Sequence, residues 1–93
     1  MQQSDLIVNG EEALKVADAL TSTSLRILQL VSQKSLDISE ISSQLELSQP
    51  YISDQVSKLE EAKLVRVSYE KGRKGIKKLC TLAYDRIVIV VRP

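Results

Sequence analysis

The spacing of apolar residues changes once along this chain, close to residue 63, and that change limits the possible folds more than any other feature. Before it, apolar residues recur every three to four positions, as on the buried face of a helix. After it, Val65, Val67 and Tyr69 alternate with polar residues, which is the period of a half-buried strand. The sequence therefore predicts an α+β chain, with helices first and strands towards the C-terminal end.

Four helices are expected before the change in period, each placed by apolar spacing and capping residues. The first follows the turn at Asn9-Gly10, and the hydroxyls of residues 21–24 offer caps for a central, buried second helix. Ser39 is the expected cap of a short third helix. Ser48 is the expected N-cap of the fourth, which should run to about Ala62.

Three segments have the composition of strands. Residues 6–8 form a short apolar run, and residues 65–82 predict a hairpin with a basic turn over residues 70–75. Ile87 to Val91 is a continuous β-branched run, expected as a strand with both faces covered. Because an unpaired strand edge is prone to aggregation, we expect this strand to pair with residues 6–8, with the hairpin, or with a second subunit.

Charges are strongly segregated along the chain, although the formal net charge is only +1. Residues 1–62 hold four basic and ten acidic residues, whereas residues 63–93 hold nine basic and two acidic residues. A basic segment on an otherwise acidic chain is a candidate surface for a polyanion. A solvated hairpin that only keeps the protein in solution is the alternative that charge alone leaves open.

Composition argues against most enzyme chemistry. The chain has no histidine and one cysteine, so the usual zinc sites, histidine-based triads and C-x-x-C redox motifs are absent. No catalytic residue, cofactor or metal is expected, and Cys80 is predicted to be a reduced thiol in the core. The longest apolar run is too short to span a bilayer, and the N-terminus lacks the basic start of a signal peptide. We therefore expect a cytoplasmic protein without a membrane partner.

Two helices joined by a tight turn and followed by a basic hairpin make the layout of a winged helix-turn-helix. A helix fits the major groove of duplex DNA, and a flanking hairpin can place Lys and Arg against phosphates or in the minor groove. We expect one domain over residues 1–93. Its helix-turn-helix should lie at about 39–62, its wing at about 65–82 and its terminal strand at about 86–91.

The candidate DNA-binding residues follow from this layout. Ile52, Val56 and Leu59 form the predicted buried stripe of the fourth helix and leave its other side exposed. The residues expected on that exposed side are Gln49, Tyr51, Ser53, Asp54, Ser57 and Lys58. The residues expected to bind DNA from the wing are Lys71, Arg73, Lys74 and Lys77, with Arg73 as the minor-groove candidate.

Three of these candidates keep an alternative. Tyr51 could stack on a base or bond a phosphate, or it could pack on the neighbouring helix. Asp54 could accept a hydrogen bond from a cytosine amine, or it could be an ordinary helix-surface residue. Lys77 and Lys78 are adjacent on a strand and should point to opposite faces, so that only one of them reaches DNA.

Four stretches of the sequence resemble the successive signatures of ArsR-type winged-helix regulators. They are Thr23–Leu28, Ile38–Ile41, Leu47–Ser53 and Leu59–Val65. The resemblance covers roughly residues 13–82. It implies a homodimer that binds a two-fold symmetric operator, with recognition-helix residues in successive major grooves. Winged helices also serve as protein-interaction modules, so the fold alone does not decide the function.

The sequence also departs from the family pattern. Metal-sensing ArsR members carry paired cysteines at the start of the third helix, where this chain has Asp37 and Ser39, which we expect as turn and cap groups. Glu46 and Lys63 stand where the family often has glycine, so they either tolerate a positive φ or the turns differ. Gln55 replaces a frequent histidine.

The expected function is sequence-selective binding of double-stranded DNA by a homodimeric transcriptional regulator that represses by occlusion. Two alternatives remain. One is a plasmid partition-site (centromere) adaptor that coats DNA and recruits segregation proteins, and the other is a winged-helix module that docks a protein partner. Many ArsR proteins dimerise through terminal helices, whereas this chain ends in a predicted strand. The interface expected from the first helix and that strand consists of Leu14, Ile87, Ile89 and Val91.

Overall fold

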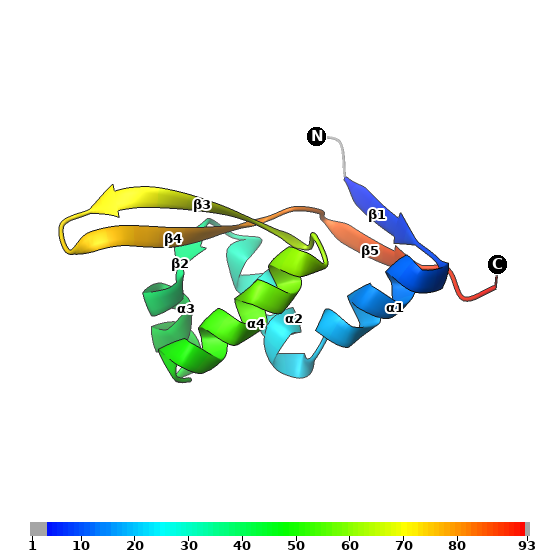
Figure 1. The fold of residues 1–93 in the computed structure, drawn as a ribbon, viewed down its shortest axis with the longest axis horizontal. Helices are drawn as coiled ribbons and strands as arrows, with labels where there is room; N and C mark the ends of the chain where they lie inside the picture. The colour runs from blue at the N-terminus through cyan, green and yellow to red at the C-terminus, as the bar shows by residue number, and fades with distance from the viewer. Residues whose placement is uncertain (1–3, 93) are drawn as a thin grey trace.

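The computed structural model describes residues 4–92, and these form an α+β winged helix-turn-helix, as the sequence predicts. The elements, in chain order, are β1 (Asp5–Val8), α1 (Gly10–Ala19), α2 (Ser22–Val31), β2 (Leu36–Asp37), α3 (Ile38–Leu45), α4 (Gln49–Glu61), β3 (Val65–Gly72), β4 (Gly75–Leu82) and β5 (Arg86–Ile89). The tip of the β3–β4 hairpin lies at one end of the elongated molecule, and β1, β5 and α1 lie at the other (Figure 1). No helix within the described residues is long and apolar enough to cross a bilayer.

The second and fourth helices begin at the caps that the sequence provides. Thr21 accepts a hydrogen bond from the amide of Ser24 at 3.0 Å, and the Ser24 hydroxyl accepts one from the amide of Thr21 at 2.7 Å. Ser48 caps α4 by accepting the amide of Tyr51 at 3.3 Å. These bonds satisfy amides that have no partner inside the helix, so both helices start at fixed residues.

The expected cap of the third helix is wrong. Asp37, not Ser39, is the N-cap of α3, because Asp37 Oδ1 accepts the amide of Glu40 at 2.8 Å. The carboxylate of Glu40 in turn accepts the amide of Asp37 at 3.1 Å, which completes a capping box. The physical reason is that a carboxylate paired with Glu three residues later satisfies two amides, whereas Ser39 lies inside the first turn.

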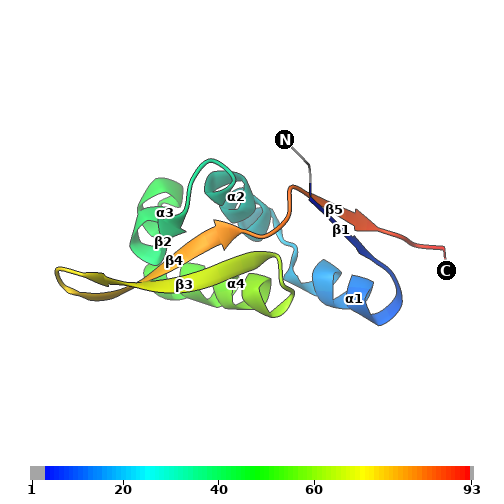
Figure 2. The ribbon, with the colours of Figure 1, turned by 90° about the horizontal axis from the view of Figure 1, so that it is seen from above.

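The core is aliphatic and lies between the helices and the inner face of the hairpin. Its fully buried large side chains come from α2, β2, α3, α4 and the turn after α4, and they are Ile27, Leu36, Ile41, Ile52, Val56, Leu59 and Leu64. Figure 2 shows the hairpin running across the helices that supply these residues. The wing is therefore held at a fixed angle to α4 by packing at its base.

Two turns have the left-handed backbone that glycine adopts most easily. Glu46 ends α3 with φ 56°, and Lys63 follows α4 with φ 65°. In both turns the next backbone amide donates a hydrogen bond to a carbonyl five residues earlier. The amide of Leu47 bonds the carbonyl of Ser42 at 3.1 Å, and the amide of Leu64 bonds the carbonyl of Leu59 at 2.9 Å. These non-glycine residues thus adopt the positive φ.

The wing spans the predicted residues, 65–82, but its strands are longer and its turn is tighter than the sequence indicates. The strands pair in antiparallel register up to Gly72 and Gly75, so only Arg73 and Lys74 form the turn, instead of residues 70–75. Gly75 has φ 120°, a conformation that favours glycine and closes a two-residue connection. β2 adds a short third strand on the other side of β4.

β5 pairs with β1 in parallel register, from Asp5 opposite Arg86 to Val8 opposite Ile89. The N-terminal run, residues 6–8, was one of the three partners expected for this strand. The expectation that both faces of residues 87–91 are covered is wrong, because β5 ends at Ile89 and the side chains that follow are exposed. The helices pack on one face of this two-stranded sheet, and the described chain has no further element for the other face.

Candidate nucleic-acid interface

The helix-turn-helix consists of α3, a short turn and α4. Ile52, Val56 and Leu59 are fully buried and hold α4 against the core. The opposite side of α4 therefore faces solvent along its whole length, as the stripe predicts. A capped, polar and exposed N-terminal half is the part of a recognition helix that meets base edges in the major groove.

The six residues expected on this side differ in exposure. Gln49, Tyr51, Asp54 and Lys58 are exposed, whereas Ser53 and Ser57 are half-buried. The two serines lie nearer the buried stripe than the sequence pattern indicates. All six remain accessible to solvent, so each can reach a ligand from the surface of α4.

Two of the exposed residues already have partners in the protein. The hydroxyl of Tyr51 lies 3.4 Å from the hydroxyl of Thr23 on α2, while 41% of the Tyr51 residue surface stays exposed. Both alternatives for Tyr51 therefore remain compatible with its position. Asp54 forms an ion pair with Lys58 at 3.4 Å, one helical turn along α4. This pairing reduces the repulsion that Asp54 alone would exert on phosphates.

The sequence pattern missed the role of Gln55. This side chain is only 5% exposed, and its Oε1 accepts a hydrogen bond from the Thr21 hydroxyl at 3.0 Å. The signal was available, because position 55 lies beside Ile52, Val56 and Leu59 on the helical face that the stripe defines. A polar residue on a buried stripe needs a hydrogen-bond partner.

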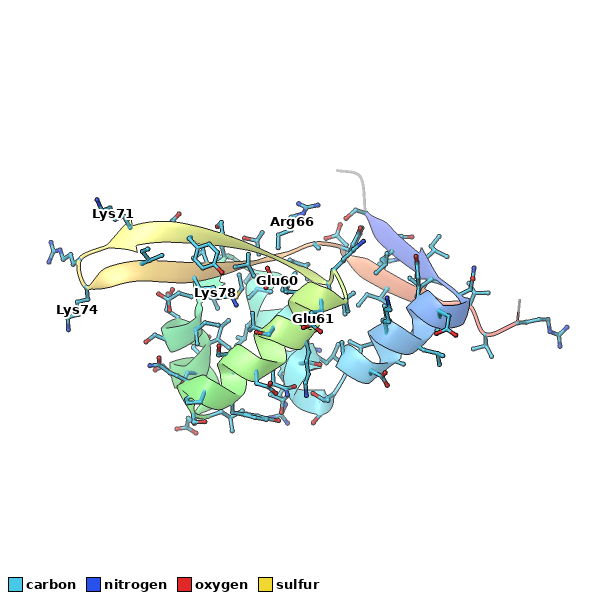
Figure 3. All side chains as sticks on the ribbon, in the orientation of Figure 1. Glu60, Glu61, Arg66, Lys71, Lys74 and Lys78 are labelled. Carbon is cyan, nitrogen blue, oxygen red and sulfur yellow. The ribbon has the colours of Figure 1, made fainter. Side chains whose placement is uncertain are left out.

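The wing presents its basic residues at the end far from the helices. Lys71, Arg73, Lys74 and Lys77 are all exposed. Figure 3 shows Lys71 and Lys74 at the tip of the hairpin, pointing away from the body of the molecule. Four of the nine basic residues between positions 63 and 93 are thereby exposed on the outer part of one projecting hairpin, where a polyanion can approach them.

Lys77 and Lys78 lie on opposite faces of β4, as their adjacency predicts. Lys77 Nζ lies 3.8 Å from a carboxylate oxygen of Asp37, and Lys78 Nζ lies 3.9 Å from Glu60 on α4. Figure 3 shows Lys78 between the hairpin and α4, close to Glu60. Lys78 thus faces the protein, and Lys77, with its side chain 58% exposed, is the one available to an external anion.

Cys80 is buried in the core beneath the wing. Burial raises the pKa of its thiol to about 11, with nearby Lys78 opposing this shift. The neutral thiol is therefore the stable form throughout the physiological range.

We expect the native protein to react with iodoacetamide at pH 8 at least about a hundredfold more slowly than the urea-unfolded chain, since the thiolate is the nucleophile. Mass spectrometry of the alkylated protein over time checks this rate. Equal rates for folded and unfolded protein would contradict the buried position of Cys80.

The residues expected at a dimer interface lie at the end of the molecule opposite the wing tip. Leu14 is 60% exposed and Val91 is 90% exposed, while Ile89 is also exposed. Ile87 is half-buried and packs against the core of its own chain. Ile87 and Ile89 also line an apolar groove of about 410 Å³ beside α2.

Comparison with known families adds to this geometry. The family described as "Bacterial regulatory protein, arsR family" matches residues 13–67, which run from α1 to the first residues of the wing. No curated protein matches the chain in sequence.

Several solved structures share the fold. Reduced HlyU from Vibrio cholerae is 27% identical with a TM-score of 0.67, over 80% of this chain and 75% of that one. A mutant of ZitR from Lactococcus lactis, solved in complex with DNA, is 27% identical with a TM-score of 0.59, over 68% of this chain and 42% of that one. A possible transcriptional regulator from Methanosarcina mazei is 20% identical with a TM-score of 0.65, over 81% and 66%, a likeness of fold alone.

Proposed function

This chain belongs to the arsR family of bacterial regulatory proteins, which are DNA-binding transcriptional regulators, and we propose that it binds a symmetric operator as a homodimer. One observation carries the proposal. The exposed polar side of α4 and the basic tip of the β3–β4 hairpin are both open to solvent, while the reverse side of α4 and the base of the hairpin pack in the core. A duplex can meet both elements at once, because the helix fits the major groove and the hairpin reaches the adjacent backbone or minor groove.

The two elements have different tasks in this proposal. α4 reads base edges through Gln49 and Ser53, since a Gln amide can bond adenine at two positions and a Ser hydroxyl can donate or accept. Lys71, Arg73 and Lys74 bind the phosphate backbone and set the register without reading sequence. Tyr51, near the N-terminus of α4, contacts a phosphate through its hydroxyl.

Replacing Gln49 with Ala should reduce the preference for the operator over random DNA by about fivefold to a hundredfold, the usual value of a good base contact. Ser53→Ala should act in the same direction and more weakly, because Ser53 is half-buried. Competition binding with operator and random duplexes measures the ratio. Gln33→Ala, an exposed glutamine after α2, is the matched control, and equal losses on both duplexes would make Gln49 a phosphate ligand.

The homodimer forms, in this proposal, through α1 and the C-terminal strand, where Leu14, Ile89 and Val91 expose apolar surface. A cluster of exposed apolar side chains at one end of a small domain is typical of an association surface. To read a symmetric operator, a two-fold axis there must place the two copies of α4 on the same side of the duplex, about one helical turn apart. Bound over a promoter, such a dimer represses transcription by occlusion.

The dependence of affinity on salt tests the proposal against a protein-docking module. Four to eight phosphate contacts per dimer predict that log K falls against log salt concentration with a slope of about −4 to −7. Fluorescence anisotropy with a labelled duplex over a range of salt concentrations gives this slope. A flat dependence would contradict DNA binding through the wing and α4.

A further inference from the structure

Of the four buried residues of α4, Gln55 alone is polar. It lies on the same face as Ile52, Val56 and Leu59, where an aliphatic residue would pack without needing a partner. Its partner, the hydroxyl of Thr21, comes from the junction between α1 and α2, 34 residues earlier in the chain. Gln55 therefore ties the recognition helix to a junction that lies outside the helix-turn-helix.

The hydrogen bond belongs to a continuous series. Thr21 Oγ1 accepts the amide of Ser24 at 3.0 Å while its own proton goes to Gln55. The Ser24 hydroxyl, which is fully buried, accepts the amide of Thr21 and donates to the carbonyl of Ala19 at 2.7 Å. Ala19 is the last residue of α1. The series thus runs from the end of α1, through the cap of α2, to the middle of α4.

Such a series constrains geometry in a way that the aliphatic contacts do not. Apolar packing has no preferred direction, so a helix held by it alone can turn or slide by small amounts. Hydrogen bonds weaken steeply when their angles change, and every bond of this series is buried or partly buried. Tyr51, one turn before Gln55, adds a second contact, to Thr23 in the first turn of α2.

We propose that Gln55 is a positioning residue that fixes the rotation of α4 relative to α1 through Thr21. The inference rests on the proposed homodimer, in which α1 belongs to the interface and α4 reads the operator. Fixing α4 relative to α1 then fixes the distance and tilt between the two recognition helices. The Gln55–Thr21 hydrogen bond thereby determines which half-site spacing the dimer accepts.

Gln55→Met is the main test, because it keeps the volume of the side chain and leaves the cap of α2 intact. Affinities are measured for the footprinted operator and for versions with one base pair added or removed between the half-sites. We expect the wild type to lose about tenfold or more on each altered spacing, and Gln55→Met to bind the operator about tenfold more weakly, with differences among spacings below about threefold. Its affinity for random DNA should not change.

Three variants serve as controls. Gln33→Met makes the same replacement at an exposed glutamine and should leave every affinity unchanged. Thr21→Ser keeps both the donor and the cap and should retain spacing discrimination. Thr21→Val with Gln55→Met should lose no more discrimination than Thr21→Val alone, because both changes remove one interaction.

Wild-type discrimination in Gln55→Met would overturn the inference, and so would equal losses on operator and random DNA. The failure of the proposed function has a different result, namely a wild type that prefers no duplex. In that case amide hydrogen exchange of the free protein decides. Faster exchange confined to α4 and the start of α2 in Gln55→Met supports the positioning role, and unchanged exchange overturns it.

Discussion

Replacing Arg73 and Lys74 together with Ala will lower the affinity for every duplex by about a thousandfold at physiological salt, and by similar factors for operator and random DNA. The two residues form the whole hairpin turn, and no ion pair holds either of them among residues 4–92. The proposed dimer carries two wings, so the double replacement removes up to about four phosphate contacts and flattens the slope of log K against log salt by about 3 to 4.

The measurement is a salt titration of the variant and the wild type on both duplexes. Lys15→Ala with Lys34→Ala removes the same charge from exposed positions in and near the first two helices and should change the slope little. The melting temperature should stay within a few degrees of the wild type, because the paired strands keep their register. A variant with an unchanged slope and unchanged affinity for random DNA would remove the wing from the interface.

Leu14→Glu with Val91→Glu will convert the protein into a monomer and reduce operator affinity by more than about a hundredfold. Both side chains are largely exposed in the single chain, so the change should not disturb its fold. Across a two-fold axis it places four carboxylates on apolar surface, where they must lose water without a partner. A monomer then binds one half-site alone. In a dimer, binding of one copy holds the second copy at a high effective concentration beside the other half-site, and the monomer loses this gain in affinity.

Sedimentation velocity measures the oligomeric state, and anisotropy measures operator affinity. Ile76→Glu is the control for association, because Ile76 is 75% exposed on the wing, at the other end of the molecule. That variant should remain a dimer. If Leu14→Glu with Val91→Glu also sediments as a dimer, the interface lies elsewhere on the protein.

Local signals in the sequence were sufficient to predict most of the fold. Thr21 and Ser48 cap helices by accepting the backbone amide of the residue three positions later in the chain. Such caps depend only on nearby residues in the sequence. The stripe of Ile52, Val56 and Leu59 located both the core face of α4 and the side left for a ligand. The change of period near residue 63 placed the wing at its observed start.

Features that depend on distant parts of the chain were not predictable in this way. β2 is two residues long, and it exists because Leu36 and Asp37 lie opposite Leu79 and Cys80 on β4. The parallel pairing of β5 was one of three possibilities, since its β-branched composition suits any partner strand. The exposure of the residues after β5 was not predicted either, because a continuous apolar run does not reveal how many of its faces are covered.

The same distinction between local and distant signals applies to the residues of the candidate site. Arg73 and Lys74 could be assigned to the wing tip from charge and turn residues alone. The burial of Gln55 could be inferred from its place on the stripe, but its partner Thr21 could not, because Thr21 lies far away in sequence and only the packing of α2 against α4 brings the two together. The ion pairs of Lys77 and Lys78 likewise depend on the register of β4 against elements that precede it.

Footprinting of the purified protein on the DNA around its own gene, over a concentration series with random duplex as competitor, tests the central claim most directly. The account predicts one discrete protected region with two-fold symmetry, whose half-sites lie about one helical turn apart. Protection that starts at one site and spreads with concentration would contradict an operator-binding regulator and favour a DNA-coating partition adaptor. Absence of protection even at low salt would contradict DNA binding itself and favour a protein-docking module.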